Sequence, residues 1–171
     1  MSIVDRLNGL RAGVLGASDG IVSTAATVIG VAAHHADRSF VAIAGLCALL
    51  AGALSMGAGE YVSVAGTRDA ERQLVKAGQM QRSAMARPWP PAGASGGAFT
   101  AGASIPLLAM VCSPIRDRVT ITFLAVLAAL TLTGVISAHL GNTPKLRPTL
   151  RVLCAGALAM ALTYLVGYVT A

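Results

Sequence analysis

Two acidic residues of this chain, Asp19 and Glu60, stand inside long apolar runs, whereas the other five of its seven acidic residues lie in polar segments. An ionisable side chain in such a run is costly to bury and usually faces a bundle interior or a water-filled path. Asp19 follows Arg11 by eight residues, and Glu60 precedes Arg68 by eight residues. At 1.5 Å per helical residue, each acid lies about 12 Å from a flanking cation. The spacing predicts two carboxylates at similar depth that share one metal or proton site.

A thioether accompanies Glu60 at helical spacing, since Met56 is four residues before it. Ser23 and Thr27 follow Asp19 at intervals of four, so each set lies on one helix face. Carboxylate oxygens alone suit Mg²⁺ or Ca²⁺, a sulfur ligand favours Fe²⁺ and its neighbours, and desolvated carboxylates bind protons more tightly. We predict Asp19, Met56 and Glu60 as metal ligands at which protons compete. Ser23 and Thr27 are candidate path-lining residues.

The same residues allow a purely structural interpretation. Asp19 would then cap or bond a neighbouring helix, Glu60 would extend toward the aqueous phase, and Met56 would fill space in the core. Three residues with no histidine among them and no repeated motif are a weak metal signal. Both interpretations stay open at this point.

Histidines follow the first apolar run. His34, His35 and Asp37 lie together there, and imidazole is a good ligand for Fe, Zn and Ni. His34 and His35 are therefore candidate exit residues for a metal, with a solvated loop as the alternative. His139 falls near the end of the fourth run and is interpreted as an interfacial residue.

The three cysteines, Cys47, Cys112 and Cys154, all fall inside apolar runs. An odd set in such positions does not make a disulfide framework. A thiol of this kind behaves as a small hydrophobic side chain. We predict that all three pack in the core.

The elements that must position these residues follow from composition. Residues are 55% hydrophobic and only 12% charged, against about a quarter charged in soluble domains. The low aromatic content of 4% does not fit an outer-membrane barrel. Apolar residues gather in five runs, each near the ~20 residues that cross a bilayer as a helix, at residues 12–33, 41–65, 92–112, 119–140 and 149–170. The sequence predicts an all-α integral membrane protein with five transmembrane helices in one domain, residues 1–171, whose first run is a retained span.

The basic residues divide unevenly between the two sides of this bundle. With the N-terminus in the cytosol, ten of the 13 basic residues fall inside and three, Arg38, Arg116 and Arg118, fall outside. The positive-inside rule therefore predicts an N-in, C-out topology. The net charge of +6 follows the edges of the apolar runs and so indicates membrane topology, not nucleic-acid binding.

The longest polar segment, residues 66–91, is predicted to be a cytosolic loop. Its first half contains good helix formers and can extend the second span into the cytosol. Pro88, Pro90 and Pro91 then end any helix, and Trp89 is placed to anchor the third span at the membrane interface.

Five helices of this size enclose little lumen, so a path for an ion would form between two chains. Small residues permit close approach of helix backbones. We predict a homodimer that packs through the first two spans, along the small residues Gly52, Ala53, Gly57, Gly59 and Gly66.

These motifs resemble a known family over essentially the whole chain. The stretches are LGASDGIVST at 15–24, AGALSMGAGEYVS at 51–63, IPLL at 105–108 and GALAMALTYLVG at 156–167. They are similar to the spans of the vacuolar iron transporter family. Longer members carry a cytosolic helical metal-binding domain between the second and third spans, for which residues 66–91 are too few. The chain resembles the short, nodulin-like and bacterial branch.

The resemblance implies a five-helix protomer, a homodimer with the path between protomers, and export of Fe²⁺ and related ions from the cytosol in exchange for protons. Asp19 and Met56 match the membrane-embedded metal residues of the family, and Glu60 matches its Gly-Glu-Tyr form. Asp69 and Glu71 are either ordinary solvated helix charges or a remnant of an attraction site for metal.

The sequence therefore predicts proton-coupled export of Fe²⁺ or Mn²⁺. The alternative is a dimeric membrane protein that binds metal or a partner without transport. No nucleophile and base pair indicates an enzyme, and no permanently bound cofactor is expected. The expected partners are a second copy, lipid, divalent ions and protons. The use of 11 Arg against 2 Lys suggests a high-GC bacterium, and hence the plasma membrane.

Overall fold

The computed structural model describes residues 3–34, 36–141 and 144–171, with side chains from residue 8 onward. Five long helices and one short 3-10 helix are present: α1 (Ile3–Ala33), α2 (Arg38–Lys76), η1 (Arg82–Ala84), α3 (Trp89–Cys112), α4 (Arg118–Leu140) and α5 (Leu146–Val169). Each of the five is long and apolar enough to cross a membrane. The predicted five-span, all-α fold is confirmed.

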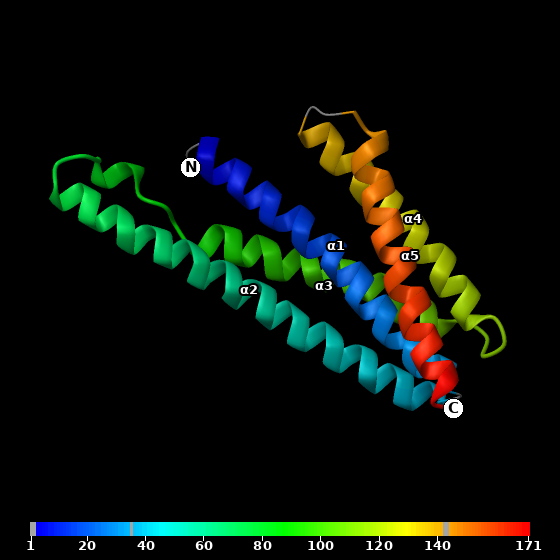
Figure 1. Cartoon of the computed structure of the whole chain (residues 1–171). Coiled ribbons are helices and arrows are strands. Elements are labelled where there is room, and N and C mark those ends of the chain that lie inside the picture. Colours follow the sequence, from blue (N-terminus) through cyan, green and yellow to red (C-terminus); the bar gives the residue numbers. More distant parts are fainter. Residues whose placement is uncertain (1–2, 35, 142–143) are drawn as a thin grey trace.

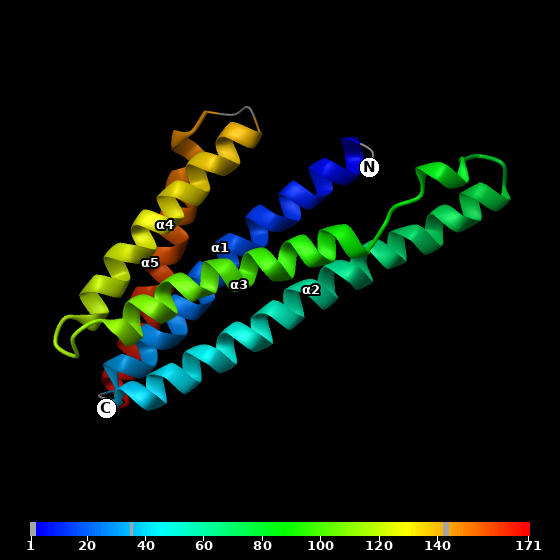
Figure 2. The same ribbon diagram turned by 180° about the vertical axis from the view of Figure 1, so that it is seen from behind.

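Helices α1 and α3 lie side by side in the middle of the molecule (Figures 1 and 2). Helix α2 packs along one flank of this pair, whereas α4 and α5 lie on the other flank (Figure 2). The buried core is therefore built mainly from α1 and α3, with residues such as Ile21, Phe99 and Leu107.

Glycines bring α1 and α3 into close contact. A Cβ atom added to Gly16 or Gly20 would overlap the backbone carbonyl of Ser95 or Phe99 on α3. In the reverse direction, a Cβ on Gly102 would overlap the carbonyl of Ala17 on α1. Small residues allow this approach of two apolar helices, which have little amphipathic character to hold them together otherwise.

The two ends of the bundle, which can be followed in Figure 1, carry different numbers of basic residues. The N-terminal part of α1, the α2–α3 connection and the facing ends of α4 and α5 lie at one end, which we call the basic end. The ten basic residues that were assigned to the inner side belong to it. The opposite end holds the C-terminus, the α1–α2 junction and the α3–α4 connection.

At the opposite end, arginines close two helix termini. Arg118 is only 5% exposed, and its Nη2 donates to the carbonyl of Ala36 at 2.7 Å, just beyond α1. Nη2 of Arg38 donates to the carbonyl of Ser113 at 2.8 Å, at the end of α3. Cations at helix C-termini satisfy unpaired carbonyls and oppose the helix dipole. Two of the three basic residues at this end therefore have a structural function.

Helix α2 continues well past its apolar run, as the sequence predicts. Its 39 residues correspond to about 58 Å, roughly twice the ~30 Å hydrocarbon thickness. Gly78 then turns the chain back in the left-handed conformation, with φ 73°. The carboxylate of Glu71 accepts a hydrogen bond from the amide of Ala86 at 2.7 Å, which ties the returning segment to α2.

The predicted loop at residues 66–91 is correspondingly shorter. Residues 66–76 are helical, and Trp89, Pro90 and Pro91 belong to the first turn of α3. Proline is tolerated in a first turn because its missing amide would be unpaired there anyway. Trp89 is exposed and its ring packs against Tyr61, with centroids 4.7 Å apart.

The prediction of core thiols is wrong, because Cys47, Cys112 and Cys154 all lie on the surface of the protomer. In a membrane helix the outward face is as apolar as the inward one, since lipid tails solvate apolar side chains well. A small apolar residue in a span therefore carries no signal of which way it faces.

The small residues of α2 are also used differently from the prediction. A Cβ on Gly52 would overlap the Phe99 ring, and a Cβ on Gly96 would lie 3.1 Å from the carbonyl of Ala53. A Cβ on Gly57 would lie 3.5 Å from the carbonyl oxygen of Ala92 on α3. Gly52, Ala53 and Gly57 thus pack α2 on α3 within one protomer. Only Gly59 and Gly66 of this run face open space.

Candidate metal site

Glu60 is half-buried on α2 and pairs with a cation of α1. Its side chain is 15% exposed, and its Oε1 is 3.9 Å from Nη2 of Arg11, whose side chain is 75% exposed. An ion pair of this length with a solvated partner is weak. In the sequence, Arg11 is close only to Asp19. In the structure, Arg11 pairs instead with Glu60, across the contact between α1 and α2.

Asp19 lies on the exposed surface of α1. Within the described residues its carboxylate accepts no hydrogen bond and makes no ion pair. Among the side chains that the structure describes, it therefore has no partner on a neighbouring helix, which the structural interpretation would require. A carboxylate left in this way on an apolar surface is costly in a bilayer.

The hydroxyls next to Asp19 are committed as donors to their own helix. Ser23 Oγ donates to the carbonyl of Asp19 at 2.6 Å, and Thr27 Oγ1 donates to the carbonyl of Ser23 at 2.9 Å. A hydroxyl that donates in this way keeps its oxygen lone pairs. Ser23 and Thr27 could therefore offer only oxygen atoms to a passing cation.

Met56 is half-buried and packs against the hydrophobic core. Its contacts are those of a packing residue, which does not prevent the sulfur from meeting an ion on its exposed side. Among the described residues, no group of three or more His, Cys, Asp or Glu side chains is close enough to hold a metal ion. One protomer therefore presents single carboxylates on separate helices rather than a complete ligand set.

At the opposite end, a groove of about 400 Å³ runs between α1 and α5 and is lined by both Thr27 and His34. His34 Nδ1 lies 3.5 Å from Thr170 Oγ1 at its edge. The structure thus brings one candidate path residue and one candidate exit residue into the same groove. His35, the second exit candidate, lies outside the described residues.

Asp37 is the N-cap of α2 and does not line the groove. Its Oδ1 accepts from the amide of Phe40 at 2.7 Å and from Ser39 Oγ at 2.8 Å. The amide of Phe40, with the Ser39 hydroxyl second, holds the pKa of Asp37 below its usual value. A cap of this kind satisfies donors that the first turn leaves unpaired.

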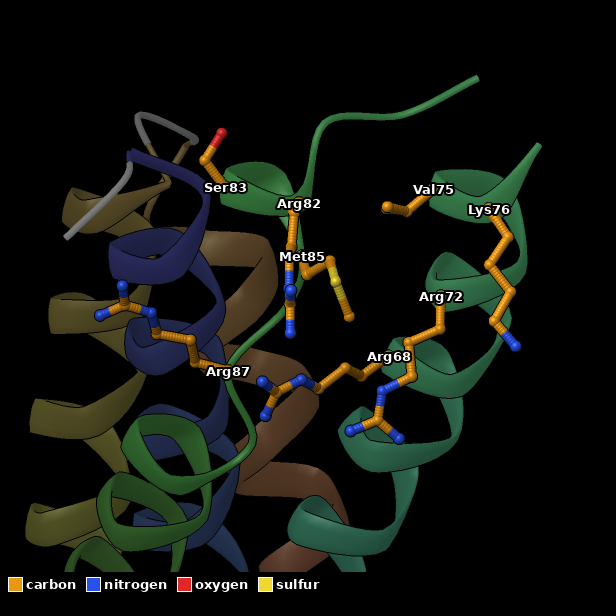
Figure 3. Close-up of a pocket in the computed structure, with 8 residues that line it drawn as sticks. All are labelled: Arg68, Arg72, Val75, Lys76, Arg82, Ser83, Met85 and Arg87. Carbon is orange, nitrogen blue, oxygen red and sulfur yellow. The ribbon is translucent and has the colours of Figure 1, made fainter. Parts of the chain in front are cut away.

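Sequence reasoning missed Arg11 and a second group of basic residues. Arg68, Arg72 and Lys76 are spaced by four on α2 and line one pocket at the basic end (Figure 3). Their spacing is visible in the sequence and would have indicated one basic helix face. Asp69 next to them pairs with Arg72, and Glu71 accepts a hydrogen bond from the amide of Ala86, so both acids have partners within the protomer.

Similarity to known proteins agrees with the motifs of the spans. A profile described as the VIT family matches residues 10–81 and 75–168, which is nearly the whole chain. The chain belongs to the VIT family. The two matched segments meet at the end of α2 and the turn after it, where residues 66–91 are too few for an additional domain.

Plant proteins are similar over most of their length. "Vacuolar iron transporter homolog 3" of Arabidopsis thaliana is 40% identical over 163 residues, covering 93% of this chain and 82% of that protein. "Vacuolar iron transporter homolog 5" of Oryza sativa subsp. japonica is 39% identical over 169 residues, with coverage of 96% and 81%. "VIT-like transporter 1b" of Glycine max is 34% identical over 173 residues, with coverage of 94% and 76%.

Family membership and five apolar helices together make this chain a multi-pass membrane protein. The predicted resemblance is confirmed, including the short connection between α2 and α3. Homodimer formation, the orientation of the bundle and the assignment of Asp19, Met56 and Glu60 as ligands remain predictions.

Proposed function

We propose that this protein transports Fe²⁺, or a similar divalent ion such as Mn²⁺, out of the cytosol in exchange for protons. The observation that carries the proposal is the exposed carboxylate of Asp19 on a membrane-spanning helix of a VIT family member. Such a group must meet water, a proton or a cation, because lipid solvates it poorly. Glu60 on the neighbouring helix supplies a second carboxylate, and Met56 a sulfur atom one turn away.

A homodimer completes this site in our proposal. A single protomer leaves Asp19 exposed, and only 11% of the most apolar window of α2 is buried, against 44% for α1. A second copy that covers these faces would bring two further carboxylates to the same level, as expected for an isologous two-fold interface. Gly59 and Gly66, which face open space, are then the small residues available for contact.

The pair of Glu60 with Arg11 suggests how charge is balanced between transport steps. With no metal bound, the guanidinium of Arg11 partly neutralises Glu60. A divalent ion competes more strongly for the carboxylate, and Arg11 is exposed enough to move into water when displaced. Protons then compete with the ion at the same carboxylates, which couples metal release to proton uptake.

The alternative is a membrane protein that binds metal or a partner without moving it. The connection between α2 and α3 favours this alternative, since it is short and its pocket is lined by cations that would not collect metal ions. Both candidates are non-enzymatic, in keeping with a family of transporters. We keep the bacterial plasma membrane as the proposed location.

Metal flux in proteoliposomes tests the proposal directly. The full chain is reconstituted, and uptake of Fe²⁺ and Mn²⁺ is measured with and without a pH gradient. We expect flux that rises with the gradient and is lost in Asp19→Asn. Asp69→Asn is the matched control, because it removes an acid that is exposed and paired with Arg72 outside the apolar run. Binding without flux in the wild type would favour the alternative.

The choice of ion is tested at Met56. Met56→Leu conserves volume and should cost less than about 1.5 kcal/mol of stability. If the sulfur is a ligand, Fe²⁺ flux falls more than Mn²⁺ flux, because the harder ion gains less from sulfur. Equal flux of both ions in the variant and the wild type would make Met56 a packing residue only.

A further inference from the structure

A basic pocket lies at the basic end, between the last turns of α2 and the segment that returns to α3 (Figure 3). Its volume is about 510 Å³, and five of its eight lining residues are basic. Arg68, Arg72 and Lys76 form the α2 wall, and Arg82 and Arg87 belong to the returning segment. In Figure 3 the side chains of Arg68 and Arg82 extend toward the same part of the pocket.

The positive charge of this pocket is mostly uncompensated. Residues 68–87 contain five basic and two acidic residues, so three positive charges remain. Asp69 offsets Arg72, and Glu71 is held by the backbone of Ala86. Nε of Arg68 is buried and has no hydrogen-bond partner among the described residues. A buried guanidinium nitrogen without a protein acceptor calls for an explanation, and a water or an ion bound beside it is a common one.

The backbone around the pocket holds these basic residues close together. Gly78 turns the chain back, and the hydrogen bond between Glu71 and the Ala86 amide fixes the returning segment beside α2. Like charges that are held close repel one another, so an anion bound between them would relieve that repulsion. A metal cation would be repelled by the same arrangement.

The pocket lies just beyond the apolar part of α2. The apolar run ends near residue 65, and the first wall residue is Arg68. The rings of Tyr61 and Trp89 are in contact, and these two residues flank the pocket residues in the sequence. Tyrosine and tryptophan typically mark the membrane–water interface. Basic pockets at this level are suited to phosphate groups, since guanidinium binds phosphate oxygens in pairs.

We propose that this pocket binds a phosphate-bearing anion through Arg68, Arg72 and Arg82. The phosphate comes either from the headgroup of an anionic phospholipid or from a soluble phosphate compound. The site is distinct from the candidate metal site and does not depend on transport activity.

Binding is tested on the full chain in detergent. The thermal midpoint is followed during titration with phosphatidylglycerol, with phosphatidylcholine as the neutral lipid, and separately with inorganic pyrophosphate. The Arg68→Gln, Arg82→Gln double variant should bind the anion about a hundredfold more weakly, since each charged hydrogen bond contributes at least roughly tenfold. Arg147→Gln removes an exposed arginine of α5 at the same end and should bind like the wild type.

The outcomes separate the two sources. Stabilisation by phosphatidylglycerol alone supports a lipid headgroup, and stabilisation by pyrophosphate supports a soluble phosphate. Equal effects of phosphatidylglycerol and phosphatidylcholine together with no effect of pyrophosphate overturn the proposal, as does an equal loss in Arg147→Gln. If the double variant does not fold, Arg68→Lys serves instead. It keeps the positive charge but loses the two parallel hydrogen bonds of a guanidinium, so it should still weaken binding of the anion several-fold.

Discussion

The basic end and the opposite end of this bundle use their charged residues in different ways. At the opposite end, Arg38 and Arg118 donate to carbonyls at the ends of α3 and α1, and Asp37 caps α2. At the basic end, Arg68 and its neighbours surround a pocket and have few acidic partners.

This difference shows that a count of charges on each side of a membrane protein mixes two kinds of residue. At the opposite end, Arg38 and Arg118 hold helix termini in place by donating to backbone carbonyls. The arginines of the basic end leave donors available, so they can act on a ligand. Charges at the basic end should therefore be removable without loss of the fold, whereas removal of the arginines that bond helix termini at the opposite end should destabilise it.

The largest effect is expected at the candidate metal site. Glu60→Gln should reduce metal-driven proton movement by about a hundredfold or more, because loss of even an outer-shell partner costs tenfold to a hundredfold. The fold should be intact, with an unchanged thermal midpoint in detergent. The double variant with Asp19→Asn should be no worse than either single variant. Losses that multiply would mean that the two acids act at independent sites.

Removal of Arg118 should damage the fold instead. Arg118→Gln loses charged hydrogen bonds to the end of α1 and should lower the free energy of unfolding by about 2–3 kcal/mol. Arg116→Gln, an exposed neighbour, should change it by less than about 0.5 kcal/mol. Denaturant titration in detergent measures both. Equal stability of the two variants would remove the structural distinction between the ends.

A smaller effect is expected for Arg11. If its guanidinium competes with metal for Glu60, Arg11→Gln should lower the half-saturating Fe²⁺ concentration about twofold to fivefold, as expected from the strength of exposed ion pairs. Arg151→Gln, an exposed arginine on α5, is the control. Weaker metal binding in Arg11→Gln would instead mean that Arg11 holds Glu60 in a productive position.

The smallest effect concerns acid stability at the opposite end. Because the folded-state pKa of Asp37 is lowered from 3.8, its charged form stabilises the fold above that value, and the stabilisation is lost as pH falls through the lower folded pKa. Asp37→Asn keeps a capping oxygen but not the charge. The difference in thermal midpoint between wild type and variant should therefore shrink as pH falls below about 4. A difference independent of pH would contradict this account.

The number and positions of the helices could be predicted from the sequence because hydrocarbon thickness sets the length of an apolar run. The continuation of α2 beyond its span was also predictable, since residues 67–76 are good helix formers. The start of α3 at Trp89 was not, because the prolines that end one helix are equally acceptable in the first turn of the next.

The facing of individual residues could not be predicted. An apolar helix surrounded by lipid has no polar face to contrast with its packed face, so the sequence does not show that Gly52 meets Phe99 or that Cys47 faces outward. The pair of Arg11 with Glu60 depends on how α1 and α2 meet, which no spacing within one helix reveals. Asp19 and Glu60 could be identified as candidate site residues because a carboxylate within an apolar run is costly on whichever side of the helix it lies.

Helix α2 runs without a proline from Arg38 to Lys76, and residues 66–76 of it project past its apolar run. A continuous helix of this kind moves as one rigid body, so a tilt at one end also moves the other end. Glu60 and the wall of the basic pocket are fixed to the same helix, eight residues apart at Arg68. A ligand or partner that tilts the projecting segment would therefore also move the turn that carries Glu60, because one helix backbone connects them.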